Sequence, residues 1–279
     1  MKNKILIVGT SHVATFKLGW NILQKKYGTE FEIDFISSPA GAWKLMNKEK
    51  GFVINNNQIC CFNNLEFYLK KAGVLGSDIP IAFKEIKFTP TKYNIILFVD
   101  LATNLSERHF IRSNEDVIYY KSRPVSMTCL LSSKLCLFSA KKIGFSFTKE
   151  KIWVEEHDPF KIIELTRKQS PLTKVYFIDK PIVLAKNSPK FYKIKDSKKN
   201  ILMALNTYES VMSQYLKKNN VSFIGHSNKT ICQETGFTDN KYSVDLNKDN
   251  IKLNPHMNQD YGVIQLTYFL NMINAPLIH

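Results

Sequence analysis

Long apolar runs are missing from this sequence. No stretch approaches the ~18 consecutive apolar residues that a membrane-spanning helix requires, so the sequence predicts no such helix. The N-terminus has lysines and then a short apolar run, Ile5 to Val8, but Gly9 and His12 interrupt it and no small-residue cleavage site follows. This pattern favours a first β-strand over a secretory signal peptide. We therefore expect the protein to be cytoplasmic.

Cysteine patterns that bind metals or form disulfide frameworks are also missing. The number of cysteines is odd and no CxxC spacing occurs among Cys60, Cys61, Cys129, Cys136 and Cys232. Zinc sites and disulfide-stapled domains both need closely paired cysteines at defined spacings. We therefore expect reduced thiols, as in a cytoplasmic protein, and no metal site.

Arginine, the residue that most often reads DNA bases, is scarce, although the formal net charge is +15. The positive charge comes from lysines scattered along the chain, apart from pairs such as Lys25–Lys26 and Lys198–Lys199. We expect no sequence-specific nucleic-acid partner. A charge of this size suits an anionic glycan or peripheral contact with an anionic membrane. The alternative is that an AT-rich genome has enriched lysines that stay solvated and bind nothing.

The sequence does contain alternating strand-like and helix-like stretches. The strand-like stretches are 5–8, 31–36, 94–100, 174–179 and 221–224. Between them apolar residues recur at helical spacing, as in a long stretch at 201–215, and a last helix is predicted over 259–273. This alternation predicts a parallel sheet covered by helices on both faces. Residues 55–90 break the rhythm and predict an inserted hairpin or lid within one domain spanning 1–279.

Residues that could take part in catalysis or ligand binding follow several predicted strands. The first strand runs into Gly9-Thr10-Ser11-His12, Gly41 follows the second, Asp100 and Asn104 follow the third, and His256 precedes the last helix. Ligands of open parallel sheets bind beyond the carboxyl ends of the strands. A serine at a helix start is well placed for nucleophilic attack, because free backbone N–H groups and the helix dipole stabilise an oxyanion. The alternative is that Ser11 only caps the helix.

These motifs resemble the sequence blocks of the SGNH (GDSL-like) hydrolases. "ILIVGTSHV" is similar to their nucleophile block, with Gly9-Thr10-Ser11 in place of Gly-Asp-Ser. Gly41, Asn104 and His256 are similar to the residues of later blocks, in the same order. "ETGFTDNKYSVD" and "NPHMNQDYG" are most similar to SGNH-type proteins encoded with bacterial surface-polysaccharide genes. The resemblance implies a flavodoxin-like three-layer α/β/α fold with a central parallel sheet.

The resemblance also implies roles for single residues. Ser11 would be the nucleophile and His256 the general base. The backbone N–H groups of Ser11 and Gly41 and the side chain of Asn104 would form the oxyanion hole. The family usually has an aspartate three residues before the histidine, and this chain has Leu253 there. Loss of the orienting acid costs triad enzymes several orders of magnitude. Either a Ser–His dyad works with another orienting group, or hydrolysis has been lost.

Other polar and aromatic residues near these motifs are candidates for binding substrate. These candidates are His12, Asp100, Trp43 and Asn254. His12 adjoins Ser11 in the sequence but should point away from it. We expect His226, which lies among turn residues, to be exposed to solvent.

Three classes of function follow from these observations. The first is a serine esterase or O-acyltransferase acting on acyl esters, especially acetyl esters, of a carbohydrate in surface-polysaccharide biosynthesis. It would need no cofactor, and acyl-CoA could be the donor of a transferase. The second is a catalytically impaired glycan-binding or assembly protein of the same fold. The third is a nucleotide-binding protein, which ranks last because "GTSHVATFKLG" lacks the glycines of GxGxxG.

Overall fold

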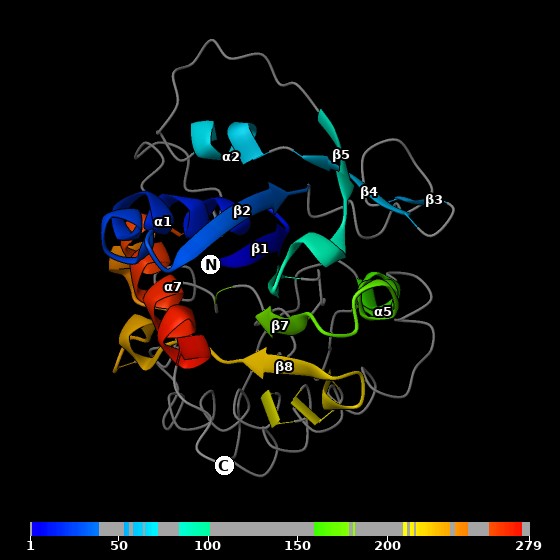
Figure 1. The fold of residues 1–279 in the computed structure, drawn as a ribbon. Coiled ribbons are helices and arrows are strands. Elements are labelled where there is room, and N and C mark those ends of the chain that lie inside the picture. The colour runs from blue at the N-terminus through cyan, green and yellow to red at the C-terminus, as the bar shows by residue number, and fades with distance from the viewer. Residues whose placement is uncertain are drawn as a thin grey trace, which may run out of the picture.

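A computed structural model gives the fold of the chain. The structure describes residues 2–38, 53–55, 58–63, 65–71, 84–100, 159–178, 181, 209–210, 213–214, 216–234, 238–244 and 257–274. The described residues contain one parallel sheet, a smaller antiparallel sheet and the helices that pack on them (Figure 1).

The central sheet has five parallel strands. They are β1 (Asn3–Gly9), β2 (Phe31–Ser37), β6 (Ile95–Val99), β7 (Lys174–Ile178) and β8 (Val221–Ile224). Their order across the sheet is β2-β1-β6-β7-β8, and every neighbouring pair is parallel. Numbered along the chain, this is the 2-1-3-4-5 order of the flavodoxin-like doubly wound fold. All five predicted strands form, with every bound within two residues of its expected position.

Burial explains the composition of these strands. Ile5 to Val8 of β1 and Ile96 to Val99 of β6 are fully buried, because helices cover both faces of the central strands. The edge strand β2 instead alternates buried and exposed residues over its first half. Continuous apolar runs therefore mark the centre of the sheet, and alternation marks its edge.

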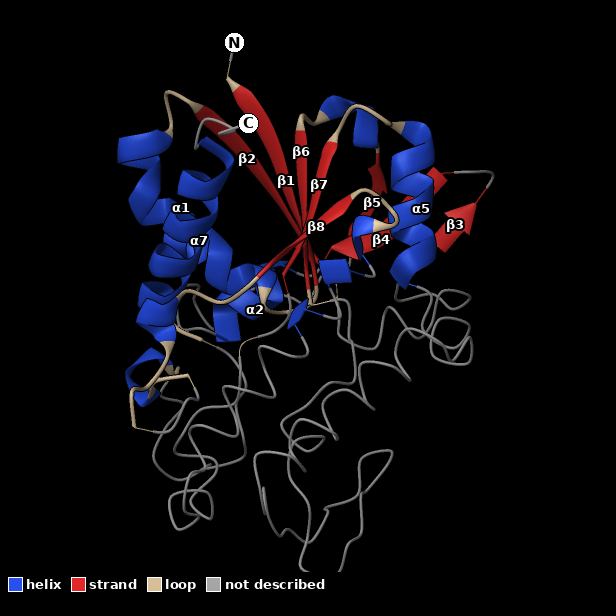
Figure 2. Ribbon diagram, turned by 90° about the horizontal axis from the view of Figure 1, so that it is seen from below, coloured by secondary structure: helices blue, strands red, loops and turns tan. Residues whose placement is uncertain are grey.

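Two helices cover one face of the sheet and a third covers the other. Helices α1 (Val13–Tyr27) and α7 (Gln259–Asn274) pack side by side on one face, and α5 (Pro159–Gln169) lies on the opposite face (Figures 1 and 2). The predicted three-layer α/β/α fold class is confirmed, and it is the architecture that the SGNH resemblance implies. None of the described helices is long and apolar enough to cross a membrane.

Glycines let α1 and α7 approach closely. A Cβ atom on Gly262 of α7 would lie 2.0 Å from the carbonyl oxygen of Thr15, and one on Gly19 of α1 would lie 2.4 Å from the carbonyl carbon of Gly262. Real Cβ atoms never approach backbone atoms this closely, so any side chain at either position would force the helices apart. The pair of glycines therefore sets where the N-terminal end of α7 lies against α1.

We expect Gly262→Ala to lower the free energy of unfolding by about 1–3 kcal/mol, because an overpacked contact between backbones cannot relax by a rotamer change. Urea unfolding followed by circular dichroism measures the loss. Gly225→Ala is the matched control, because its Cβ would meet only the flexible carboxylate of Glu209, at 3.1 Å. Equal losses in the two variants would contradict the proposed role of the helix contact.

The predicted insertion at 55–90 forms a small antiparallel sheet with a helix. Its elements are β3 (Val53–Asn55), β4 (Gln58–Asn63), α2 (Leu65–Lys71) and β5 (Lys84–Phe88), and the strand order is β3-β4-β5. Strands β3 and β4 make a hairpin, and β5 pairs with β4. Leu69 of α2 packs against Ala14 and Leu18 of α1, so the insertion is anchored one turn beyond the start of α1.

The remaining predictions about organisation fall largely outside the described residues. Of the predicted helix at 201–215, the described residues 209–210 and 213–214 are helical, as are 216–217 directly after it. That the whole chain 1–279 forms one domain stays a prediction.

Candidate active site

The turn between β1 and α1 lies at the carboxyl edge of the sheet, next to the end of β6. A Cβ atom on Gly9 would lie 1.9 Å from the carbonyl oxygen of Val99, so only glycine fits at this point. The Thr10 N–H donates to that same carbonyl oxygen at 3.2 Å, and the Ser38 N–H donates to the Gly9 carbonyl at 2.8 Å. The neighbouring strand ends therefore fix the backbone that leads into Ser11.

Ser11 lies in this turn, two residues before α1 begins, and its side chain does not cap the helix. The N-cap residue is His12, which makes no side-chain cap, and the first turn is closed by backbone hydrogen bonds such as that from the Ala14 N–H to the Ser11 carbonyl, 3.2 Å. Among the described residues, neither the hydroxyl nor the N–H of Ser11 has a hydrogen-bond partner. Ser11 therefore has a donor hydroxyl and a donor N–H at the positive end of a helix.

A buried carboxylate contacts both sequence neighbours of Ser11. Asp100, directly after β6, is 4% exposed. Its Oδ2 accepts a hydrogen bond of 2.7 Å from the Thr10 hydroxyl and lies 3.7 Å from the His12 Nε2. The Asp100 backbone has φ 52°, in the left-handed region that aspartate tolerates better than most residues, and its N–H donates to the Ile178 carbonyl at 2.9 Å.

The structure therefore brings three of the predicted site residues together: Ser11, His12 and Asp100. His12 and Asp100 are both buried, and each contacts the other. Their predicted contact with a substrate stays a prediction. The remaining predicted residues lie outside the described residues, namely Gly41, Trp43, Asn104, Asn254 and His256.

The segment that begins α7 is held against α1 close to Ser11. The Thr15 hydroxyl donates a hydrogen bond of 3.0 Å to the Met257 carbonyl, across 242 positions of sequence. Thr15 lies one helical turn after Ser11. On its other side Met257 forms a β-bridge with Ser243. The start of α7 is thus fixed from two sides at the carboxyl edge of the sheet.

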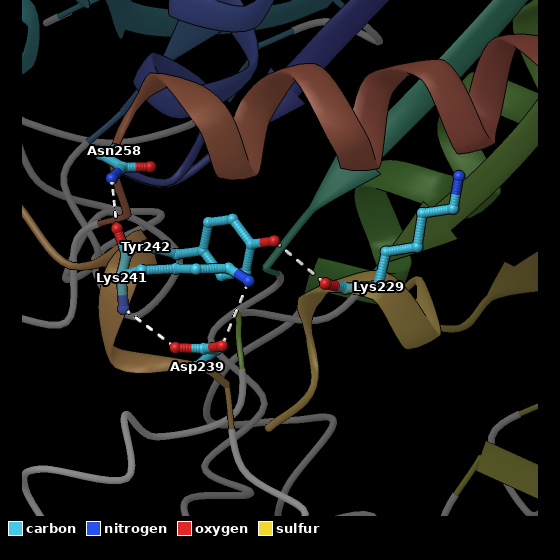
Figure 3. Close-up of polar contacts among 5 residues, drawn as sticks. All are labelled: Lys229, Asp239, Lys241, Tyr242 and Asn258. Atoms are coloured by element: carbon cyan, nitrogen blue, oxygen red, sulfur yellow. Dashed lines mark hydrogen bonds and ion pairs between the residues drawn. The ribbon is translucent and has the colours of Figure 1, made fainter. Parts of the chain in front are cut away.

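Polar contacts hold the loop that precedes Ser243 (Figure 3). The Asn258 side-chain amide donates to the Lys241 carbonyl at 2.8 Å, and the Tyr242 hydroxyl donates to the Lys229 carbonyl at 3.0 Å. Lys241 lies over the Tyr242 ring and pairs with Asp239 at 3.3 Å, a contact that raises the pKa of Lys241. These contacts hold the backbone that positions Met257.

The expectation for His226 is corrected by the structure. His226 follows β8 and is half-buried, and its Nδ1 lies 2.9 Å from the hydroxyl of the buried Tyr261 on α7. Turn composition alone indicated exposure, because nothing in the local sequence shows that α7 packs over this loop. The buried Gln265 of α7 also bonds to it, accepting from the Ser227 N–H and donating to the Gly225 carbonyl.

Sequence reasoning missed Thr15 and Met257, which dock the start of α7 beside the serine turn. Their hydrogen bond joins a hydroxyl to a backbone carbonyl, and such a contact leaves no motif in the sequence. Among the described residues no group of three or more histidine, cysteine, aspartate or glutamate side chains could hold a metal ion.

Comparisons with known proteins find distant similarities to solved structures. No family model and no curated protein matches the chain. Among solved structures, it is similar to the periplasmic domain of a lipopolysaccharide acetyltransferase of Salmonella ser. Paratyphi A, with 13% identity, a TM-score of 0.42 and coverage of 98% of this chain and 84% of that one. It is also similar to an extracellular lipase of Streptomyces rimosus, with 10% identity, a TM-score of 0.47 and coverage of 97% and 99%. Because these values are low, the fold assignment rests on the strand order and register.

Proposed function

We propose that the protein is an SGNH-like serine esterase or O-acyltransferase that acts on acyl esters, especially acetyl esters, of a carbohydrate. One observation carries the proposal. The Ser11 hydroxyl and N–H stand at the start of α1, at the carboxyl edge of a flavodoxin-like sheet, with no bond to the described residues. Ligands of such sheets bind at this edge.

The proposed chemistry passes through an acyl-serine. The Ser11 oxygen attacks the ester carbonyl carbon while His256 accepts the hydroxyl proton, and a tetrahedral oxyanion forms. His256 then returns the proton to the departing alcohol as the carbon–oxygen bond breaks. Water or a sugar hydroxyl, deprotonated in turn by His256, then attacks the acyl carbon. The bond from that carbon to the Ser11 oxygen breaks, His256 returns the proton to the Ser11 oxygen, and the free acid or the transferred ester is released.

The docking of α7 supports His256 as the base. His256 directly precedes Met257, and consecutive Cα atoms are ~3.8 Å apart. Met257 is hydrogen-bonded to Thr15, one helical turn from Ser11. We propose that His256, the residue before Met257 in the sequence, reaches Ser11 from this segment. A Ser–His dyad needs the two side chains within hydrogen-bond reach.

The oxyanion would be stabilised by preorganised donors. The Ser11 N–H is available for this role among the described residues. We propose the Gly41 N–H and the Asn104 side chain as the other two donors, and Trp43 and Asn254 as substrate contacts. Removing one such donor typically costs about 10²–10³ in kcat.

Asp100 is proposed as a positioning residue. It contacts Thr10 and His12, the residues on either side of Ser11, and so restrains the backbone of the nucleophile from both directions. Preorganisation of this kind matters because a small misplacement of a reacting group can cost two orders of magnitude in rate. The reacting groups themselves would be Ser11 and His256.

The proposed biological setting is bacterial surface-polysaccharide assembly in the cytoplasm. The formal net charge of +15 suits an anionic glycan or a phosphate-bearing sugar as substrate. The proposed reaction needs no cofactor, and acyl-CoA would be the donor if the acyl group is transferred to a sugar.

The test is labelling with a fluorophosphonate followed by peptide mapping. We expect the adduct on Ser11 and a rate that falls roughly 10³-fold or more in His256→Ala, since the histidine activates the serine. Labelling at another residue, or at Ser11 independently of His256, would contradict the proposed dyad. A screen of acetylated sugars then identifies the ester.

The second candidate is a glycan-binding protein that has lost turnover. Leu253, at the position where the family usually has the orienting aspartate, favours it. This candidate predicts saturable carbohydrate binding by calorimetry that survives Ser11→Ala, with no acyl release. Acyl release from any sugar ester that depends on Ser11 would rule it out.

A further inference from the structure

The amino edge of the central sheet, where the five strands begin, has exposed lysines across one half. They lie beside the starts of β6, β7 and β8, and we call them the basic edge: Lys92, Lys168, Lys174, Lys217 and Lys218. Backbone hydrogen bonds join neighbouring strand starts at this edge, as from the Lys174 N–H to the Asn94 carbonyl and from the Asn94 N–H to the Lys4 carbonyl, both 2.9 Å. In Figure 2 these strand starts lie on the side of the N-terminus.

The charge of the basic edge is not neutralised by the described residues. None of its five ammonium groups is in an ion pair there. The acidic residues of the amino edge lie at β2 instead, and each already has a partner. Glu32 pairs with Lys4, Glu30 accepts from the Asn274 amide, and Asp34 accepts from the Tyr93 hydroxyl.

An apolar side chain stands among these lysines. Leu172, in the turn between α5 and β7, is 96% exposed, and Pro171 beside it is also exposed. Lys168 and Lys174 flank this turn in the sequence. Surfaces that bind anionic bilayers combine basic residues, which contact the headgroups, with apolar side chains that enter the interface.

Favourable interactions with helix dipoles explain only some of the lysines of the basic edge. Lys168 is near the end of α5, Lys217 ends the helical stretch before β8, and Lys218 follows it directly. Positive charge at the end of a helix interacts favourably with the helix dipole. Lys174 is the first residue of a strand, so no dipole accounts for it. The dipole also gives no reason for an exposed leucine in the same turn.

We propose that the basic edge docks on an anionic lipid surface, with the lysines at the headgroups and Leu172 in the interface. Nucleic acid fits less well, because the described residues of this edge offer no exposed aromatic ring on which a base could stack. The one arginine there, Arg167, is half-buried and donates to the Thr173 carbonyl. This proposal does not depend on the chemistry at Ser11.

Docking in this orientation would direct the carboxyl edge away from the bilayer. Ser11 and the basic edge lie at opposite ends of the sheet, separated by about 20 Å, the length of a strand such as β1. The serine would then meet water-borne substrates, or the distal part of a glycan that stands off the membrane.

The test is co-sedimentation of the full chain with vesicles of phosphatidylcholine alone or mixed with phosphatidylglycerol. We expect binding only to the mixed vesicles, and weaker binding as salt rises. Each lysine near the surface contributes roughly fivefold in affinity, so K92E/K174E should weaken binding at least ~25-fold. K229E/K241E, with the same charge change outside the basic edge, is the matched control and should change it by less than about threefold.

Leu172→Ser tests the apolar contact without changing charge, and should weaken binding to mixed vesicles while leaving the unfolding midpoint in urea unchanged. It also keeps the proposal testable if K92E/K174E does not fold. Equal weakening by the two double variants would assign binding to net charge and overturn the proposal. Equal binding to both kinds of vesicle, or displacement from mixed vesicles by a single-stranded oligonucleotide that binds more tightly, would also overturn it.

Discussion

Ser11→Ala should abolish acyl release, with a fall in kcat of roughly 10⁴- to 10⁶-fold, the range seen when the nucleophile of a serine enzyme is removed. The loss is expected to be large because no other described group at this turn can form the acyl intermediate: Thr10 donates its hydroxyl to Asp100. Release of acetate from acetylated sugars, or of a chromogenic alcohol from an acetyl ester, measures the effect.

The stability of the Ser11→Ala variant should be close to that of the parent. The hydroxyl caps no helix and bonds to no described residue, so its removal leaves no described group without a partner. Ser222→Ala, an exposed serine of β8, is the matched control and should keep full activity. Activity retained by Ser11→Ala would refute the acyl-serine mechanism, and the glycan-binding candidate would then be tested by calorimetry.

Asp100→Asn should lower kcat about 10- to 100-fold with little change in KM, since the residue restrains the nucleophile and does not bind the reacting ester. The asparagine amide oxygen can still accept the Thr10 hydrogen bond, and asparagine tolerates the left-handed backbone at φ 52°. What the substitution removes is the negative charge beside His12. The rate at which the fluorophosphonate labels Ser11 should therefore fall as well.

Asp100→Ala should lower kcat more than Asp100→Asn does, and it should also lower the free energy of unfolding. It removes the acceptor of the buried Thr10 hydroxyl, and an unsatisfied buried donor costs about 1–3 kcal/mol of stability. Thr10→Val separates the two contacts, because it deletes the hydroxyl and leaves the Asp100–His12 pair in place. If Asp100→Asn matched the parent in kcat and in the rate of Ser11 labelling, Asp100 would have a purely structural role.

Much of the fold could be predicted from the sequence. Strands buried on both faces need continuous apolar runs, such as Ile5 to Val8, and helices on a sheet need apolar residues at a period of about 3.6. These are local requirements, so a local pattern is enough to reveal them. The last helix was expected at 259–273 and forms at Gln259–Asn274. Residues 55–90 break this rhythm, which predicts an insertion there.

The candidate site could be predicted less completely. Glycine and serine directly after an apolar run mark a strand-to-helix turn, so Ser11 could be singled out from its neighbours alone. The role of Asp100 could not, because its partner Thr10 is 90 positions away. The sequence makes Asp100 a candidate substrate contact, which stays a prediction, and the structure adds that its buried carboxylate contacts both neighbours of Ser11.

The alternation of elements, the parallel sheet and the serine at its first turn follow from residue type and spacing over short stretches of sequence. Which distant residues meet depends on how the elements pack in three dimensions. The parallel register sets the end of β6 beside that of β1, which brings Asp100 to Thr10, and two facing glycines let α7 lie against α1, so that Met257 bonds to Thr15. The same register lines up the strand starts, so lysines scattered through the sequence share one edge of the sheet.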